Sequence, residues 1–296
     1  MTRRPAVVLG FDMETDVGSW TPFYDGLVKG TPRLLRLLDR KRATSTFFFT
    51  GDAAREHPEV VRAARDAGHE VGNHSLYHET MGDEILPIPG LKPLLPSEVP
   101  GRLKAAEALI TSALGRRPRS FRAPRLWGST ALLNALEDMD YVADASYPMF
   151  FHRDRLAPYH PSRRDWTRPG RMRILEIPNA ADMGMRSRDP VGRDRDLWPI
   201  FRTQGSDAVM ARLVSFARVV ERRRLPLVIC LYFHPWEFAP MPQGLIRYGE
   251  GAVLPDKFIV RNCGAPALRE LSRLIDALRS RFNAEFLSAD QLAATW

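Results

Sequence analysis

The sequence predicts an α/β fold, and within that class an irregular (β/α) barrel with seven or eight parallel strands. Segments with β-like and helix-like patterns alternate along the whole chain of 296 residues. Some strand-like segments, such as 7–9 and 227–233, are apolar without interruption, which is typical of parallel strands covered on both faces. Seven or eight β-α units favour a barrel over an open sheet. We therefore expect a single domain over residues 1–296, with enough chain for a large buried core.

The individual elements follow from local patterns of apolar and turn-forming residues. Eight strands are predicted, over residues 5–11, 44–49, 69–73, 118–122, 141–144, 173–177, 226–233 and 284–287. Seven helices are predicted between and after them, over residues 31–41, 52–67, 97–114, 129–139, 206–223, 265–281 and 288–295.

Local signals suggest where the first two helices begin and end. Thr31 and Pro32 combine a capping residue with a proline in the first turn, so they predict the start of the first helix. Asp52 is a candidate cap for the second helix. Gly68 predicts the end of that helix, because glycine adopts a left-handed backbone at little cost.

Composition excludes some classes of protein. No stretch reaches the roughly eighteen apolar residues that indicate a membrane helix, and residues 1–4 lead into a strand without an export segment. We therefore expect a cytoplasmic protein with no membrane partner. Cys230 in an apolar strand and Cys263 in a loop agree with a reducing compartment, and nothing in the sequence requires a disulfide between them.

The net charge of +8 comes almost wholly from arginine. The arginines are distributed over the predicted helices and form no single stripe with interleaved aromatic residues. We therefore expect no nucleic-acid partner. An acidic small substrate is compatible with this charge.

Histidines and carboxylates stand at the ends of three predicted strands. His74 and His78 lie four residues apart, a spacing at which both imidazoles can bind one metal ion. Asp12 and Glu14 end the first strand, and His234 ends a late one. Because α/β barrels carry their chemistry at the carboxyl ends of their strands, these side chains predict one common site.

Two long segments, 81–100 and 146–205, interrupt the alternation of strands and helices. Long loops in compact domains are usually functional or disordered, and the tryptophans and prolines here argue against disorder. We expect them to form walls or a lid over the site, or else an oligomer contact. A homo-oligomer is therefore left open.

Five motifs stand in order at strand ends, and their order resembles that of the polysaccharide deacetylase family. The motifs are Phe11-Asp12-Met13-Glu14, His74-Ser75-Leu76-Tyr77-His78, Arg122-Ala123-Pro124, Asp144-Ala145-Ser146 and Leu231-Tyr232-Phe233-His234-Pro235. The resemblance covers about residues 5–290. It implies the NodB homology fold, a distorted TIM barrel, and carbohydrate esterase family 4 chemistry. In detail, the chain is similar to the branch that includes an intracellular-type peptidoglycan deacetylase and allantoinase-like proteins.

The resemblance implies a divalent metal ion, zinc first and cobalt or a similar ion as alternatives. His74 and His78 would bind it, and a carboxylate would complete a site with two histidines and one carboxylate. The commoner family pattern has two adjacent aspartates, whereas one residue separates Asp12 from the next carboxylate here. The role of metal ligand therefore passes to Glu14, with Asp16 in reserve.

The resemblance also assigns catalytic roles. Asp12 would be the general base that accepts a proton from the attacking water, and Arg122 would hold that base in orientation. The backbone N–H of Arg125 would stabilise the oxyanion. His234 would be the general acid that protonates the departing amine, which otherwise leaves poorly.

The residue that tunes His234 is left open by the sequence. Many family members use an aspartate for this purpose, and the fourth motif here keeps one aspartate but lacks the second aspartate and the tryptophan. Asp144, Asp182 or neither could serve.

Three further residues are expected to contact the substrate. Leu231 would line a pocket for the acetyl methyl, and Trp127 and Trp236 would stack on a sugar face. The leading function is a metal-dependent hydrolase that removes N-acetyl groups from amino sugars or polysaccharide. The alternatives are a cyclic amide or imide hydrolase, such as an allantoin-like activity on a small metabolite, and a non-enzymatic binding protein.

Overall fold

A computed structural model describes residues 4–88 and 90–296. Residues 1–3, at the start of the predicted domain, and residue 89, inside the predicted loop 81–100, lie outside the described residues. The described part contains a sheet of eight strands, and all the pairings between them are parallel. They are β1 (Ala6–Met13), β2 (Thr46–Phe49), β3 (Glu70–Asn73), β4 (Ser120–Phe121), β5 (Ala143–Asp144), β8 (Leu175–Glu176), β9 (Val228–Phe233) and β12 (Glu285–Phe286).

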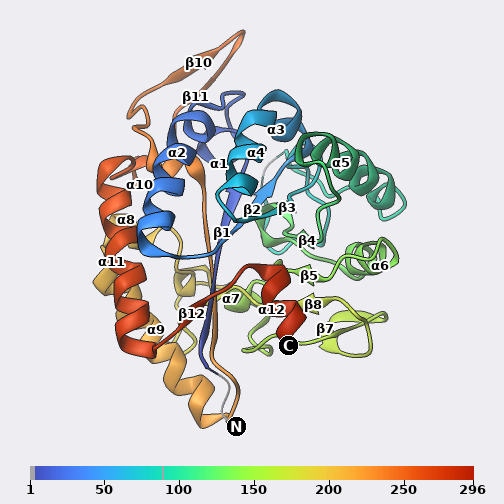
Figure 1. The fold of residues 1–296 in the computed structure, drawn as a ribbon, viewed down its shortest axis with the longest axis vertical. Helices are drawn as coiled ribbons and strands as arrows, with labels where there is room; N and C mark the ends of the chain where they lie inside the picture. The colour runs from blue at the N-terminus through green and yellow to red at the C-terminus, as the bar shows by residue number, and fades with distance from the viewer. Residues whose placement is uncertain (1–3, 89) are drawn as a thin grey trace.

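The long strand β1 lies at the centre of this sheet (Figure 1). It pairs with β9 over residues 6–11, with β2 over residues 10–13 and with β12 at residues 6 and 7. From β2 the sheet continues through β3, β4 and β5 to β8. Isolated bridges from Asn179 to Pro148 and to Cys230 of β9 then bring the chain after β8 back to β9. The predicted irregular (β/α) barrel with seven or eight parallel strands is confirmed.

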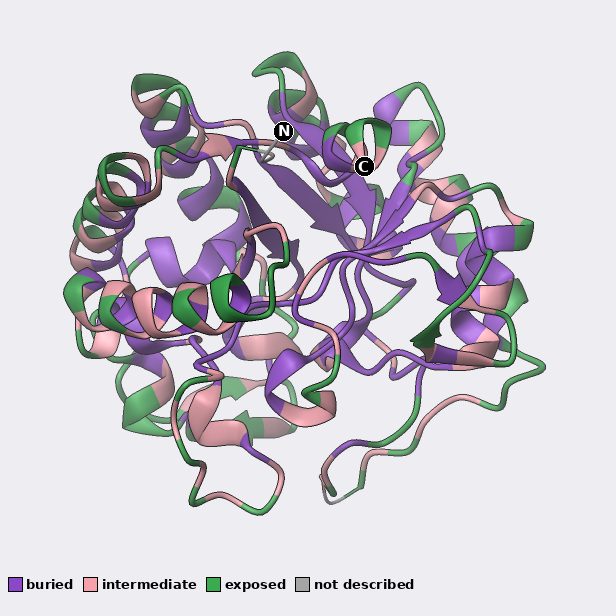
Figure 2. Cartoon of the chain, turned by 90° about the horizontal axis from the view of Figure 1, so that it is seen from below, coloured by how far each residue is buried: buried purple, intermediate pink, exposed green. Residues whose placement is uncertain are grey.

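Helices surround the sheet, and their outward faces are exposed whereas the strands are buried (Figure 2). The longer ones are α2 (Asp25–Lys41), α3 (Gly51–Glu56), α4 (Pro58–Asp66), α5 (Val99–Leu114), α6 (Thr130–Asp138), α9 (Ser206–Arg222), α11 (Ala265–Phe282) and α12 (Ala289–Thr295). Short helices are α1 (Asp16–Ser19), α7 (Met149–His152), α8 (Ile200–Thr203) and α10 (Lys257–Val260), and 3₁₀ turns are η1 (Pro124–Leu126), η2 (Arg193–Arg195) and η3 (Pro235–Phe238).

The predicted start of the first helix is wrong. The helix α2 begins at Asp25, and Thr31 lies inside it. Tertiary packing explains the difference, because Gly26 and Gly30 allow the first turns of α2 to lie directly against η3. A Cβ atom on Gly26 would be 2.2 Å from a Cα of η3, and one on Gly30 would be 2.0 Å from a carbonyl oxygen of η3. This contact holds the end of β9, where His234 is found, against α2.

The second predicted helix is divided into α3 and α4 just before Pro58, because proline cannot continue a helix without losing a hydrogen bond. The predicted cap is also wrong. The hydroxyl of Thr50 accepts the hydrogen bond from the N–H of Ala53 at 3.2 Å, and Asp52 lies in the first turn. The predicted end is confirmed, since Gly68 has φ of 81°.

Two antiparallel hairpins outside the barrel were not predicted. They are formed by β6 (Pro161–Ser162) with β7 (Asp165–Pro169), and by β10 (Ile246–Tyr248) with β11 (Gly251–Val253). The second hairpin projects away from the rest of the chain (Figure 1). Within residues 4–88 and 90–296, no helix has the length and apolar character needed to cross a membrane.

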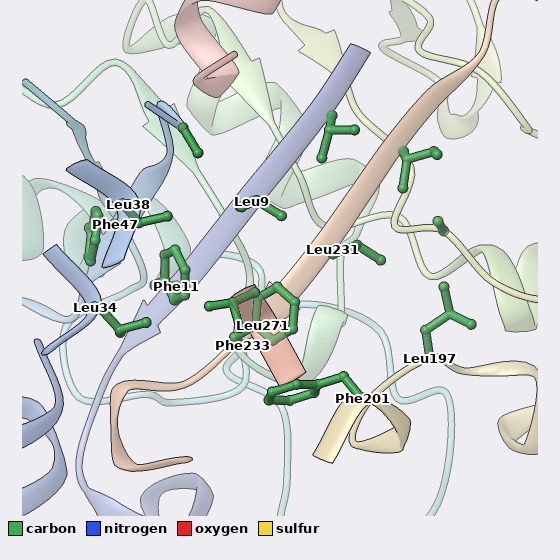
Figure 3. Packing of buried hydrophobic residues seen from close by; sticks show 14 of the residues in the cluster. Leu9, Phe11, Leu34, Leu38, Phe47, Leu197, Phe201, Leu231, Phe233 and Leu271 are labelled. Atoms are coloured by element: carbon green, nitrogen blue, oxygen red, sulfur yellow. The ribbon is translucent and has the colours of Figure 1, made fainter. Parts of the chain in front are cut away.

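The largest hydrophobic cluster lies between the sheet and the helix layer (Figure 3). Alternate residues of β1 and β9, such as Leu9, Phe11, Leu231 and Phe233, meet Leu271 and other residues of the helices there. Burying this face fixes the direction of the intervening residues of both strands, which point toward the barrel interior.

The arginines are less scattered than the sequence suggested. Arg33, Arg36 and Arg40 of α2 and Arg269 and Arg273 of α11 line one groove of about 460 Å³. Two short rows of arginines on separate helices are joined here, because α2 packs beside α11. No aromatic residue is among those described along the groove, so the expectation of no nucleic-acid partner stays a prediction.

Candidate active site

Three of the strand ends that carry motifs, those of β1, β3 and β9, meet at one cavity of about 510 Å³. Asp12 and Glu14 enter it from the end of β1, His78 from the segment after β3, and His234 from the end of β9. The prediction that three strand ends form one site therefore agrees with the arrangement of the chain.

Glu14, His74 and His78 form a compact cluster at this cavity. Their candidate ligand atoms all lie within 4.8 Å of one another, and all three residues are buried. The Nε2 atom of His78 is 2.5 Å from Oε2 of Glu14, and Nε2 of His74 is 3.7 Å from the same oxygen. The structure thus brings Glu14 to the two histidines. Asp16, the reserve ligand, instead accepts a hydrogen bond from the N–H of Gly26 at 2.8 Å.

The donor atoms of this cluster fit a divalent ion. Oε1 of Glu14 and Nε2 of His74 are buried without a hydrogen-bond partner among the described residues. Unsatisfied buried polar atoms are costly, and bound metal would satisfy them. The Nδ1 atom of His74 lies 2.7 Å from the carbonyl oxygen of Arg122, which orients the ring so that Nε2 faces the cluster.

The neighbouring imidazoles also set the charge of Glu14. Burial alone would raise the pKa of this carboxyl, but His78 and His74, with His234 beyond them, hold the pKa well below its ordinary value. Burial lowers the pKa of His78. A divalent metal binds an ionised carboxylate and a neutral imidazole, so the shift of Glu14 and the shift of His78 both favour metal binding.

Asp12 is held by a buried arginine, as the sequence predicted. Nη1 of Arg122 donates to Oδ1 of Asp12 at 2.9 Å, and Nε donates to the carbonyl oxygen of Ala145 at 3.1 Å. Gly10 makes room for this guanidinium, since a Cβ atom there would lie 2.1 Å from Nη1. The carboxylate of Asp12 is therefore fixed from inside the barrel while it still lines the cavity.

His234 has a partner that the sequence analysis missed. Its Nδ1 lies 3.1 Å from Oε1 of Glu237, and its backbone N–H donates to the same oxygen at 2.9 Å. Arg202 and Trp198 also donate hydrogen bonds to Glu237. Burial lowers the pKa of His234, but the hydrogen bond that its imidazole donates to Glu237 and the charge of Glu14 outweigh burial and raise the pKa above its ordinary value.

Neither aspartate considered as a partner for His234 contacts it. Asp144 accepts a hydrogen bond from the hydroxyl of Ser146 at 2.6 Å inside the barrel, and Asp182 accepts one from the N–H of Gly184 at 3.1 Å. A signal for Glu237 was present in the sequence, because a glutamate three residues after a capping position is typical of a capping box.

Three of the four predicted substrate contacts line the cavity, namely Arg125, Trp127 and Trp236. The fourth, Leu231, does not. It lies in the hydrophobic core between β9 and the helices (Figure 3), because alternate residues of a strand face opposite sides. Tyr232 lines the cavity in its place, and its position two residues before His234 could have identified it.

The walls of the cavity come from loops. The predicted loop 81–100 contributes Leu86 and Ile88, and the predicted loop 146–205 contributes Arg193 and Trp198. Their interpretation as walls of the site is therefore supported. Two further segments were not predicted to take part, the turn with Val17, Gly18 and Trp20 and the segment with Val253, Leu254, Pro255, Asp256 and Ile259.

Comparison with known proteins agrees with this description. Residues 2–143 match the family model for polysaccharide deacetylase. The chain is 32% identical over 155 residues to a chitooligosaccharide deacetylase of Bradyrhizobium sp. (strain ANU 289), a match that covers 51% of this chain and 59% of that protein. The match therefore spans less than two thirds of that relative.

The fold as a whole is similar to that of solved structures. A putative polysaccharide deacetylase from Mycobacterium smegmatis matches over 100% of this chain and 94% of its own, with a TM-score of 0.62 and 18% identity. The Puue allantoinase matches over 99% of this chain and 89% of its own, with a TM-score of 0.61 and 18% identity. At these identities the likeness shows the fold. Residues 2–143, slightly less than half of the chain, thus resemble polysaccharide deacetylases, which confirms the resemblance seen in the motifs of this part, and the chain as a whole has the fold of these solved structures.

Proposed function

We propose that this protein is a metal-dependent hydrolase that removes N-acetyl groups from amino sugars or polysaccharide. The observation that carries the proposal is the meeting of three groups at one cavity: the Glu14, His74 and His78 cluster, the Asp12–Arg122 pair, and the His234–Glu237 pair. Hydrolysis of an amide requires activation of the carbonyl, a base and an acid, and this site offers candidates for each.

A divalent ion held by Glu14, His74 and His78 would supply Lewis-acid chemistry to the substrate carbonyl. We expect zinc first, with cobalt or a similar ion as an alternative. Asp12 accepts a proton from the attacking water, and the guanidinium of Arg122 keeps its carboxylate oriented for this transfer.

On the other side of the reacting amide, His234 donates a proton to the leaving amine. Glu237 favours this role because its carboxylate supports the protonated imidazole. The backbone N–H of Arg125 stabilises the oxyanion, and Trp127 and Trp236 offer apolar contact to a sugar ring. Tyr232 takes the place along β9 that the sequence had assigned to Leu231.

The proposal is tested by measuring metal content together with acetate release from N-acetylglucosamine oligomers. We expect bound divalent metal and acetate release that is lost on chelation. In the Asp12→Asn variant, acetate release should fall by about 10²- to 10⁴-fold, the range for loss of a general base, while metal remains bound. Full acetate release by Asp12→Asn would refute the assigned base, and a metal-free, fully active protein would refute the metal dependence.

A second candidate function is hydrolysis of a cyclic amide or imide in a small metabolite. The closure of the cavity by loops favours it, because a volume of about 510 Å³ suits a small molecule. Allantoin and hydantoin serve as probes. Ring opening without acetate release from any N-acetylated sugar would favour this function over deacetylation. Bound metal with no hydrolysis of either type would instead favour a binding protein on the same scaffold.

A further inference from the structure

A groove between two helices brings five arginines together outside the catalytic cavity. It lies between α2 and α11, has a volume of about 460 Å³ and shares no lining residue with the cavity. The other described residues along it are Leu37, Leu268 and Ser272, so no acidic side chain is among them. The arginines are Arg33, Arg36, Arg40, Arg269 and Arg273. The proposed hydrolase chemistry uses none of these residues.

The arginines form two rows, one on each side of the groove. Residues three or four positions apart lie on the same side of a helix, so the three arginines of α2 form one row and the two of α11 form the other. The longer row extends about 10 Å along α2, since each residue adds about 1.5 Å to a helix. The groove therefore presents cationic groups on both sides, over a length that suits several linked anionic groups.

Neighbouring carboxylates do not balance these charges. Directly after the row on α2, Nζ of Lys41 pairs with Asp276 of α11 at 2.5 Å. In residues 4–88 and 90–296, Arg273 alone among the five arginines has a carboxylate partner, Glu270 of its own helix at 3.3 Å. That carboxylate also accepts hydrogen bonds from the N–H and the hydroxyl of Ser206. Because like charges repel one another, the empty groove lowers the stability of the protein.

We propose that this groove binds a small molecule that carries a chain of phosphate groups. Guanidinium groups bind phosphate oxygens through paired hydrogen bonds. Arg36, Arg40 and Arg269 form no hydrogen bond or ion pair with the described part of the chain, so their donors are available. A chain of phosphates can contact both rows at once, and the volume lies within the range of small-molecule sites. This inference does not depend on the proposed hydrolase function.

The lining of the groove favours a small ligand over a macromolecular anion. Surfaces that bind single-stranded nucleic acid combine cationic groups with aromatic rings on which bases stack, and the described lining contains no aromatic residue. Helices that lie on a membrane surface insert apolar side chains. Leu37 is buried, however, and none of the exposed large apolar side chains described lies along the groove.

Isothermal titration calorimetry with tripolyphosphate tests the proposal. The test protein carries Arg36→Gln and Arg269→Gln, which remove one exposed cation from each row. The matched control carries Arg62→Gln and Arg218→Gln, which change the net charge equally at exposed positions of α4 and α9 outside the groove. We expect the Kd for tripolyphosphate to rise at least about 10-fold in the test protein and to stay within about twofold of the wild-type value in the control.

Two further ligands define which feature of the probe is bound. Orthophosphate cannot reach both rows, so its Kd for the wild-type protein should be at least about 10-fold higher than that of tripolyphosphate. Equal Kd values for these two anions would refute binding of a phosphate chain. ATP carries the same chain on a nucleoside. A lower Kd for ATP than for tripolyphosphate would indicate a nucleotide, and an equal or higher Kd would indicate the inorganic chain.

Thermal unfolding gives an independent measurement. Tripolyphosphate should raise the Tm of the wild-type and control proteins more than that of the test protein, because a ligand stabilises the state that binds it. Equal increases of Kd in both double variants would overturn the proposal, because net charge alone would then attract the probe. An unchanged Kd in the test protein would overturn it by placing the probe elsewhere. Absence of tripolyphosphate binding, with duplex DNA binding that the test protein loses, would replace it with a nucleic-acid partner.

Discussion

The floor and the rim of the cavity are built in different ways. The floor is lined by Asp12, Glu14, His78 and His234, which are buried at or after the ends of barrel strands, and His74 and Arg122 contact these residues from behind. The rim consists of loop residues such as Trp20 and Leu254, whose side chains are 50% and 69% exposed. Hydrogen bonds fix Asp12 and His234 in the floor, whereas the rim residues lie in loops and are exposed.

In the proposed hydrolase, the two parts would have different roles. A proton acceptor, a proton donor and a metal cluster must keep their distances within fractions of an ångström, which buried side chains on strand ends can do. Selection of a substrate depends on shape and charge around that centre, which loops can change without disturbing the barrel. Substitutions in the floor should therefore lower the hydrolytic activity much more than substitutions in the rim.

The largest effect is expected at the metal cluster. Glu14→Gln removes the negative ligand from the two histidines, so we expect loss of bound metal and a fall in activity of at least about 100-fold. Metal analysis of purified protein checks the first and acetate release the second. Asp16→Asn is the matched control, because this carboxyl lies two residues away and outside the cluster, and it should keep its metal. Equal metal content in both variants would show that the floor is not the metal site.

A smaller loss of activity is expected when Glu237 is replaced, and it should appear mainly in the pH dependence of kcat. The pKa of His234 is raised by Glu237, so the imidazole stays protonated to higher pH. Glu237→Gln removes that carboxylate and lowers the pKa, so the alkaline limb of the kcat–pH profile should move to lower pH. At alkaline pH the rate should fall by about 10-fold, with a smaller change below the limb.

The pH profile separates this role from a purely structural one. Arg202 loses its buried counter-ion in the same variant, so thermal unfolding must first show that the protein is folded. A loss of rate that is equal at all pH values would contradict the role of Glu237 in supporting the acid. Glu237→Asp, which keeps the charge, should leave the alkaline limb closer to that of the wild-type protein.

The smallest effect is expected on the rim. Leu254→Ser changes an exposed side chain, so the free energy of unfolding should change by less than about 0.5 kcal/mol. Turnover of a small N-acetylated sugar should stay within about threefold of the wild-type value, because one apolar contact contributes little. A tenfold or larger loss of kcat in this variant would show that the rim takes part in the chemistry. It would contradict the expectation that only floor substitutions lower the activity strongly.

Much of the barrel could be predicted from local sequence. All eight predicted strands occur in the sheet. The apolar segments of β1 and β9 gave the clearest signals, because such segments are typical of parallel strands covered on both faces. The helix boundaries were harder. The start of α2 depends on the contact of Gly26 and Gly30 with η3, and that contact joins segments far apart in the chain.

The residues of the site could likewise be predicted only in part. His74, His78, Asp12 and His234 could be identified because each stands at a strand end, where barrel geometry brings distant segments together. The sequence could not decide between Glu14 and Asp16 as the third member of the cluster, because that choice depends on how the chain turns after β1.

By itself, then, the sequence determined the kind of fold and the residue types at the centre of the site. The apolar pattern of each strand and the order of the motifs can both be read along the chain. Only the tertiary structure decided which side chains are partners. Glu237 rather than Asp144 supports His234, and Tyr232 rather than Leu231 faces the cavity. The physical reason is that hydrogen bonds and burial depend on distances across the barrel, which the order of residues along the chain does not specify.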